Sequence, residues 1–478
     1  MAKKLIFIAV MLVILASLGI TLAVLNRPDP KAAPAAFQDE REYIIDLGGA
    51  SAGEGGAASV TIKNSAGEYT VVPGDTASIQ GYENFSVDTY YLRRIIDVSG
   101  RLVSQGLVTD EETDLAPFGL APPRAEVRIK PVQGSEVILY IGNQSPDGYN
   151  VYAKKEGSPS IYLAGSGDTG NYLKGALDFI DPEISPAPAD NGSGTLVFDR
   201  ITLGGAVRQG EEVNIFDSDS AGAANSPVKT SIRISGPIEA RLNMDRGYAA
   251  IQTIFGIRAS RVAARINGSG DLAKFGLDKP WSTASVSGVL GQGLGGFGLR
   301  ASKPDTAGKV YIQREGTDLV YEADASPLSW LETSWFDLMD RLIIFPFIDT
   351  VSSVEVRTPA RTVSFSLSGD GDELKVKALG IDIDTANFRT YYQTLMFAMY
   401  DEVSSEKPAP GAKPVMEISY HYRDGKAADT VSFYSTDSRR VLTSFNGGRA
   451  FYTFAVYVDR VLADLDQILA GKKVLSYI

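Results

Sequence analysis

A set of landmarks in this 478-residue chain occurs twice at one constant separation. The tripeptide Phe118-Gly119-Leu120 is followed 157 residues later by Phe275-Gly276-Leu277. Two further landmarks keep the same separation, in the pairs Pro123 and Pro280, and Thr169 and Ser326. Unrelated turns would not keep one separation over three landmarks, so the sequence predicts an internal duplication. The fold must therefore be one in which a single module is used again.

The first copy combines alternating strands with two helices. Strand-like segments, the last two of them hairpins, lie at 43–47, 60–63, 69–72, 127–141 and 149–164. Ser86 is placed as the N-cap of an amphipathic helix of about 18 residues, because apolar residues then recur on one face at helical spacing. A second helix is expected over 169–180.

The same order returns in the second copy, and again in a third, shorter one. In the second copy the expected strands lie at 195–198, 213–216 and 231–235, and the expected helices at 244–264 and 326–342. In the third copy the expected strands lie at 353–357, 362–367, 374–378 and, as hairpins, 415–435 and 440–454, and the expected helices at 385–400 and 456–470. Pro410-Gly411-Ala412-Lys413-Pro414 stands in place of the Phe-Gly-Leu motif.

The predicted fold class is α+β. An N-terminal transmembrane helix is followed by three tandem repeats, each an antiparallel β-sheet or set of hairpins with two packing helices. The expected division is a cytoplasmic N-terminus at 1–4, a transmembrane helix at 5–25, a Pro/Ala linker at 26–42, repeat 1 at 43–182, a linker at 183–194, repeat 2 at 195–348 and repeat 3 at 349–478.

The N-terminal helix is expected from Leu5 to Leu25, a stretch without a charged residue. As a helix it would reach roughly 30 Å, the thickness of the hydrocarbon core of a bilayer. Lys3 and Lys4 precede it, so the N-terminus is expected in the cytoplasm and the bulk of the chain outside. A cleaved signal peptide is the alternative, but its apolar region is usually shorter, about 7–15 residues.

Composition excludes several classes of function. The net charge of −12 repels nucleic acid. The absence of cysteine excludes disulfides, a cysteine nucleophile and a lipid anchor on cysteine. Since the chain also has only one histidine, His421, it offers no basis for a His-based triad or a zinc site. His421 is expected on the solvated face of a strand.

Three short motifs suggest chemistry but have simpler interpretations. Gly291 to Gly296 matches G-x-G-x-x-G, yet a strand rather than a helix follows it, which favours a hairpin loop. The acidic segments 370–373 and 217–219 lack the spacing of a calcium loop. We therefore predict no catalytic, cofactor-binding or metal-binding residues.

One apolar region is expected to join repeats. It comprises Trp330, Trp335 and Phe336 together with the segment 342–348, the most apolar stretch outside the N-terminal helix. Its aromatic side chains are expected in the core between repeats 2 and 3 rather than in a ligand cage.

The order of these elements resembles a bacterial family called domain of unknown function 4340. The resemblance lies in the Phe-Gly-Leu-x-x-Pro turn after a helix, the strand end Leu139–Gly142, and the segment from Thr443 to Tyr452 with its following helix. It implies a single-anchor envelope protein, of a kind often encoded beside subunits of gliding-motility-type ABC transporters. It implies no catalytic residues.

These observations favour a membrane-anchored extracytoplasmic accessory or scaffold protein that acts by contact and is not an enzyme. The expected partners are the membrane and a membrane protein such as an ABC transporter subunit, with no cofactor. The alternative is an envelope glycan-binding protein or a hydrolase that uses carboxylate or Ser/Lys chemistry.

Overall fold

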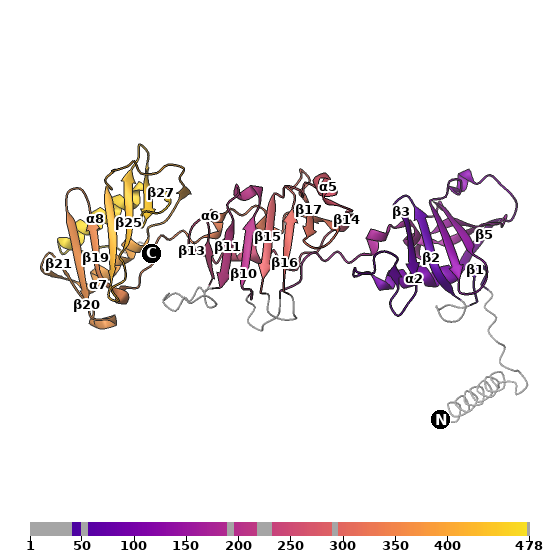
Figure 1. Ribbon diagram of the computed structural model, residues 1–478, viewed down its shortest axis with the longest axis horizontal. Helices are drawn as coiled ribbons and strands as arrows, with labels where there is room; N and C mark the ends of the chain where they lie inside the picture. Colours follow the sequence, from indigo (N-terminus) through magenta and orange to yellow (C-terminus); the bar gives the residue numbers. More distant parts are fainter. Residues whose placement is uncertain (1–40, 49–55, 189–195, 218–231, 289–294, 476–478) are drawn as a thin grey trace, which may run out of the picture. The chain divides into compact units, whose positions relative to one another are not determined.

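The computed structural model describes residues 41–48, 56–188, 196–217, 232–288 and 295–475 (Figure 1). The chain forms two compact units that divide between Ile180 and Asp181. The expected N-terminus at 1–4, the expected membrane helix at 5–25 and most of the expected linker at 26–42 lie outside the described residues. Within the described ranges, no helix is both long and apolar enough to cross a membrane.

Three nine-stranded antiparallel sheets make up the described fold, one in unit 1 and two in unit 2. The first sheet contains β1 (Tyr43–Asp46), β2 (Ala57–Asn64), β3 (Gly67–Val72), β4 (Ser78–Ile79), β5 (Arg101–Thr109), β6 (Ala125–Pro131), β7 (Val137–Gln144), β8 (Asn150–Lys155) and β9 (Ile161–Gly165). The second contains β10 (Arg200–Gly204), β11 (Val213–Asp217), β12 (Ile232–Ser235), β13 (Ala240–Arg241), β14 (Arg261–Arg265), β15 (Ser282–Ser287), β16 (Gly296–Ala301), β17 (Lys309–Arg314) and β18 (Leu319–Asp324). The third contains β19 (Val351–Arg357), β20 (Thr362–Ser368), β21 (Lys375–Ala378), β22 (Ile381–Ile383), β23 (Glu402–Val403), β24 (Met416–Tyr422), β25 (Asp429–Ser435), β26 (Arg440–Phe445) and β27 (Ala450–Phe454).

The second and third sheets share one connection order. Each begins with a four-stranded meander, β10 to β13 in the second sheet and β19 to β22 in the third, and a helix follows. The next strand, β14 or β23, lies at the opposite edge of the sheet. There it pairs with β18 or β27, which is the last strand of a second four-stranded meander. The two meanders are joined by β10 with β15 or by β19 with β24. The first sheet follows the same plan, with β2 joined to β6 and with β1 added outside β5. The predicted repetition of one β-rich module is confirmed.

The Phe-Gly-Leu motif forms the same turn in both copies. A 3-10 helix, η1 (Ala116–Phe118) or η6 (Ala273–Phe275), ends at a left-handed glycine with φ of 64° at Gly119 and 67° at Gly276. The leucine that follows each glycine is buried. Glycine is required here because other residues adopt positive φ only at a cost. In both copies the motif thus serves packing, because the turn buries the leucine after each glycine.

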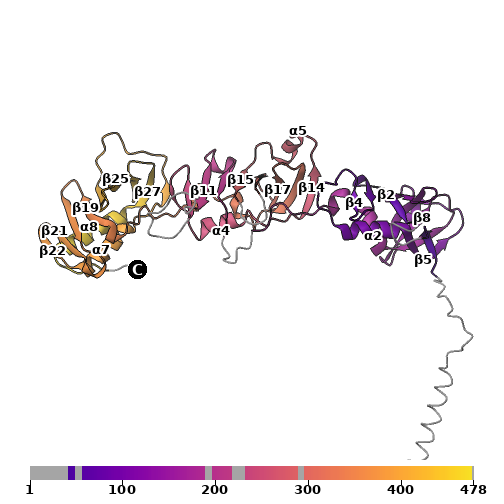
Figure 2. The ribbon, with the colours of Figure 1, turned by 60° about the horizontal axis from the view of Figure 1, so that its bottom comes forward.

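The two helices expected in the third repeat are present. They are α7 (Thr385–Met396) and α8 (Ala455–Leu469), which lie together against the sheet (Figure 2). Phe388 and Leu395 on α7 share one core with Val461 and Leu465 on α8. Long, regularly spaced apolar positions predicted both helices correctly.

The helices expected in the first two repeats are shorter than predicted. The helix expected from Ser86 is α2 (Thr89–Gly100), capped instead by Asp88, whose carboxylate accepts hydrogen bonds from the amides of Tyr90 and Tyr91. Its last expected residues belong to β5. The helix expected at 244–264 is α4 (Arg246–Gln252), and after it the chain enters β14.

Neither closing helix of the first two repeats is continuous, which corrects the prediction of two packing helices in every repeat. The segment expected at 169–180 is divided among α3 (Ser166–Thr169), η2 (Gly170–Leu173) and η3 (Ala176–Phe179). The segment expected at 326–342 contains η7 (Ser329–Leu331) and α6 (Trp335–Leu338). Gly170 and Gly175 disfavour a long helix in the first segment.

Candidate functional site

Aromatic side chains join the second and third sheets within unit 2. The ring centroid of Phe451 on β27 lies 6.1 Å from that of Trp335 and 6.0 Å from that of Phe336, both on α6. Tyr400 stacks on Phe451 with 3.9 Å between ring centroids. The prediction that Trp335 and Phe336 contribute to a core between these repeats is confirmed. Trp330 is also fully buried, and its carbonyl oxygen accepts a hydrogen bond from Arg208 of the second repeat.

The apolar segment after α6 also pairs with the third repeat. Leu342 forms an isolated antiparallel bridge with Met399. The amide of Ile343 donates a hydrogen bond to the carbonyl oxygen of Ala398 at 2.9 Å. The amide of Tyr400 donates one to the carbonyl oxygen of Arg341, also at 2.9 Å. Backbone hydrogen bonds and ring packing therefore hold this part of unit 2 together.

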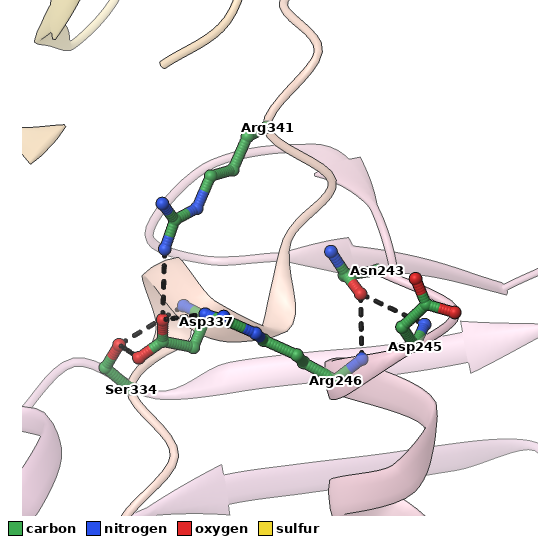
Figure 3. Close-up of polar contacts among 6 residues, drawn as sticks. All are labelled: Asn243, Asp245, Arg246, Ser334, Asp337 and Arg341. Carbon is green, nitrogen blue, oxygen red and sulfur yellow. Dashed lines mark hydrogen bonds and ion pairs between the residues drawn. The ribbon is translucent and has the colours of Figure 1, made fainter. Parts of the chain in front are cut away.

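A polar network at α6 fixes the start of this segment (Figure 3). Asp337 accepts a hydrogen bond from the hydroxyl of Ser334 at 2.7 Å and one from Arg341 at 3.2 Å, while Arg246 on α4 lies 3.9 Å away. Asn243 in turn accepts from the amide of Arg246 at 2.8 Å. The network ties α4, α6 and the joining segment together.

A groove of about 770 Å³ lies beside this network and is called the junction groove here. Its lining includes Arg241, Asp340, Phe345, Tyr422 and Arg449. Arg241 pairs with Asp340 at 2.7 Å, and Arg449, which lies over the ring of Trp335, pairs with Glu211 at 2.9 Å. Phe345 keeps 41% of its surface exposed. The groove therefore offers apolar surface beside two ion pairs.

Tyr422, which lines the junction groove, is held in place by a short chain of hydrogen bonds. The hydroxyl of Tyr422 donates to Asp429 at 2.6 Å, and Asp429 also accepts from the side chain of Asn446 at 2.9 Å. Burial, together with the hydrogen bond to Asp429, raises the pKa of Tyr422 well above its ordinary value. Tyr422 therefore acts here as a hydrogen-bond donor to Asp429.

The structure places the sequence motifs apart from this groove. His421 is exposed on β24, as predicted. Asp370 forms an ion pair with Arg423, and Asp372 is exposed near it. Most of the glycine-rich motif at 291–296 and part of the acidic segment 217–219 lie outside the described residues. In the ranges the structure describes, no cluster of three or more His, Cys, Asp or Glu side chains could hold a metal ion.

The buried charge of Arg208 is not predicted by any motif in the sequence. Arg208 is 2% exposed and donates hydrogen bonds to the carbonyl oxygens of Gly204, Trp330 and Thr333 and to the hydroxyl of Ser282. Burial lowers the pKa of Arg208 to about 10, so it remains charged at neutral pH. Nothing in the local sequence distinguishes Arg208 from a surface arginine, so only the tertiary structure identifies it.

Comparison with known proteins gives one match. A family model described as Domain of unknown function (DUF4340) matches residues 78–195 and 233–413, more than half of the chain. The matched regions cover both Phe-Gly-Leu turns and the joining segment of unit 2. No curated protein and no solved structure matches the chain.

Proposed function

The chain belongs to the DUF4340 family of domains of unknown function, and from that premise we propose that it acts by protein contact rather than by catalysis. It would serve as an extracytoplasmic accessory or scaffold protein, anchored by residues 5–25 with its N-terminus in the cytoplasm. Its partner would be a membrane protein of an ABC-type transport system, as the family resemblance implies.

One observation carries this proposal, namely the junction groove. Its ion pairs, such as Arg241 with Asp340, neutralise charge, and its exposed Phe345 offers apolar surface. Protein-binding surfaces combine such an apolar centre with polar groups at the rim. An active site would instead bring titratable groups together around a reacting atom.

Crosslinking in intact membranes tests the contact. A photoreactive amino acid at position 345 should give an adduct with a membrane protein. The same group at position 379 is the control, because Leu379 is 68% exposed on a turn of the third sheet away from the groove lining. Equal adducts at both positions, or none at 345, would contradict the proposed contact surface.

The anchor is tested separately by replacing residues 5–25 with a cleavable export signal. A short tether raises the effective concentration toward the millimolar range, so the released protein should fold yet lose its function. His421→Ala, Asp370→Asn and Asp372→Asn should keep the function. Full function from the released form would favour the alternative of an enzyme or a glycan-binding protein.

A further inference from the structure

A second, smaller pocket lies beside the Phe-Gly-Leu turn of the second sheet. It measures about 410 Å³ and is lined by three lysines and three aromatic residues, Lys274, Lys279, Lys303, Phe275, Trp281 and Tyr311. We call it the lysine pocket. Its position in unit 2 is separate from the lining of the junction groove.

The charge in the lysine pocket is unbalanced. Lys274 pairs with Asp271 at 2.6 Å, but no carboxylate lines the pocket in the described part of the chain. Lys279 and Lys303 are both exposed, and the ammonium of Lys303 lies 5.1 Å from the ring centroid of Trp281. Asp278, beside Lys279 in the chain, is exposed outside the lining. The lysine pocket is therefore locally positive, although the whole chain has a net charge of −12.

Aromatic surface faces the same space. Phe275 and Tyr311 meet edge to face with 5.1 Å between ring centroids, and the rings of Phe275, Trp281 and Tyr311 are all partly exposed. Apolar ring faces stack on the flat faces of bound rings, while ammonium groups select a negative charge. The combination suits a ligand that carries both a ring with apolar faces and an anionic group.

The first copy of the duplicated sequence has none of these three lysines. Asp114 to Pro123 and Asp271 to Pro280 share the aspartate, leucine, alanine, phenylalanine, glycine and proline that build the turn. At the constant separation of 157 residues, prolines occupy the positions of all three lysines, in the pairs Pro117 and Lys274, Pro122 and Lys279, and Pro146 and Lys303. The turn forms without a lysine in the first copy, so the positive charge distinguishes the second copy from the first.

The surroundings of the two turn glycines also differ. The side chain of Asn143 lies 2.3 Å from the position of a Cβ on Gly119, whereas the nearest atom to that position on Gly276 is the Cβ of Ser302 at 3.6 Å. The space beside the glycine is therefore open at the second turn, whereas Asn143 fills it at the first turn.

From these observations we propose that the lysine pocket binds an anionic saccharide. Its sugar ring would stack on the aromatic surface, and its carboxylate or phosphate would contact Lys279 and Lys303. This site goes beyond the proposed scaffold role and does not depend on it, because it uses no residue of the junction groove and requires no partner protein.

Tryptophan fluorescence of the full chain in a nonionic polyether detergent tests the proposal. Trp281 is partly exposed, whereas Trp330 and Trp335 are buried, so ligand binding should change the emission of Trp281 first. The probes are a short oligosaccharide of hexuronic acid, a hexose phosphate, a neutral oligosaccharide and inorganic phosphate. The first two distinguish carboxylate from phosphate as the anionic group.

We expect saturable binding of at least one charged sugar, weakened by added salt. The double variant Lys279→Ala/Lys303→Ala should weaken it about tenfold or more, because charge-assisted hydrogen bonds are lost. Lys130→Ala, which removes an exposed lysine from unit 1, should leave it unchanged. Since both lysines are exposed, the double variant is expected to fold.

Three results would overturn the proposal. The first is that neither charged sugar binds at millimolar concentration. The second is that the double variant binds as tightly as the original protein. The third is that the neutral sugar or inorganic phosphate binds as well as the charged sugars, which would remove the need for an anionic group or for a ring.

Discussion

The carbonyl oxygen of Phe118 lies 2.3 Å from the position that a Cβ on Gly142 would occupy. The 3-10 turn that ends in Phe118 therefore rests directly on the end of strand β7. This contact explains why the strand motif Leu139–Gly142 ends in glycine: any side chain at 142 would push the turn away.

Gly142→Ala should accordingly destabilise unit 1. The clash involves backbone, which cannot rotate aside, so we expect a loss of about 1–3 kcal/mol in the free energy of unfolding. Gly170→Ala is the matched control, because its Cβ would meet nothing within 4 Å and its φ of −59° suits alanine. Urea denaturation of both variants measures the difference, and equal stability would show that the turn can move.

Arg208→Ala should destabilise unit 2 by more than about 3 kcal/mol, because the carbonyl oxygens of Gly204, Trp330 and Thr333 would lose their donor and the first two of these hydrogen bonds are buried. The control is Arg258→Ala, which removes a 59% exposed ion-pair partner of Asp181 and should cost about 1 kcal/mol or less. A small effect at position 208 would mean that water or a neighbouring residue replaces the guanidinium.

The same arginine gives a prediction about pH. Burial lowers the pKa of Arg208 to about 10, below its value in the unfolded chain, so the folded state holds this proton less tightly. The cost of burying the charge is therefore constant at neutral pH and is relieved only as the pH rises through about 10. The Arg208→Ala effect measured between pH 6 and pH 8 should not change. A steep dependence in that range would point to another group.

Asp464 on α8 should make stability depend on pH in acid. Its side chain is 3% exposed, and burial raises its pKa despite the hydrogen bond from Thr394 and the nearby Arg460. A carboxyl group with a raised folded pKa holds its proton more tightly when folded. Its contribution to stability is therefore full below the unfolded pKa of about 4 and falls as the pH rises through the folded pKa.

Asp464→Asn should thus gain stability relative to the original chain as the pH rises from about 3.5 to 7. Asp466→Asn, which removes the 65% exposed ion-pair partner of Arg361 from the same helix, should not gain stability as the pH rises. Hydrogen exchange of the α8 amides across this range measures both variants. A gain that is largest at low pH would contradict the assigned direction of the pKa shift.

The aromatic contact between the second and third sheets should couple their unfolding. Phe451→Ala removes a fully buried ring that meets Trp335 and Phe336, and should cost about 3–5 kcal/mol. Calorimetry should then resolve separate transitions within unit 2. Phe454→Ala, on the same strand but 51% exposed, should leave the transitions unchanged. Separate transitions in the original protein would show that the contact does not couple the sheets.

Residue patterns predicted those parts of the fold that depend on local sequence. The Phe-Gly-Leu turns, the meanders and the helices α7 and α8 follow from glycine at positive φ, alternation and long apolar spacing. The sequence pattern places the end of the α2 helix too late. Leu102 and Val103 continue its apolar face, although β5 already begins at Arg101. A helix and a strand in direct succession can share apolar positions, so periodicity alone does not locate the boundary.

The sites were less predictable than the fold. The burial of Arg208 and the junction groove depend on contacts between segments far apart in the sequence, which no local pattern encodes. The lysine pocket is an intermediate case. Comparison of Asp114–Pro123 with Asp271–Pro280 reveals the change from proline to lysine, but only the fold shows that Trp281 and Tyr311 lie beside those lysines.

The pairing that joins two meanders in each sheet has a consequence for the order of assembly. Strands within a meander are close in sequence, so each meander can form from local contacts as the growing chain leaves the ribosome. The closing pair, such as β10 with β15, connects residues 200–204 to 282–287 and must wait until the helix and the edge strand between them have been synthesised. Until then each half-built sheet exposes an open edge, so synthesis that stalls inside such an interval would leave the nascent protein vulnerable to aggregation.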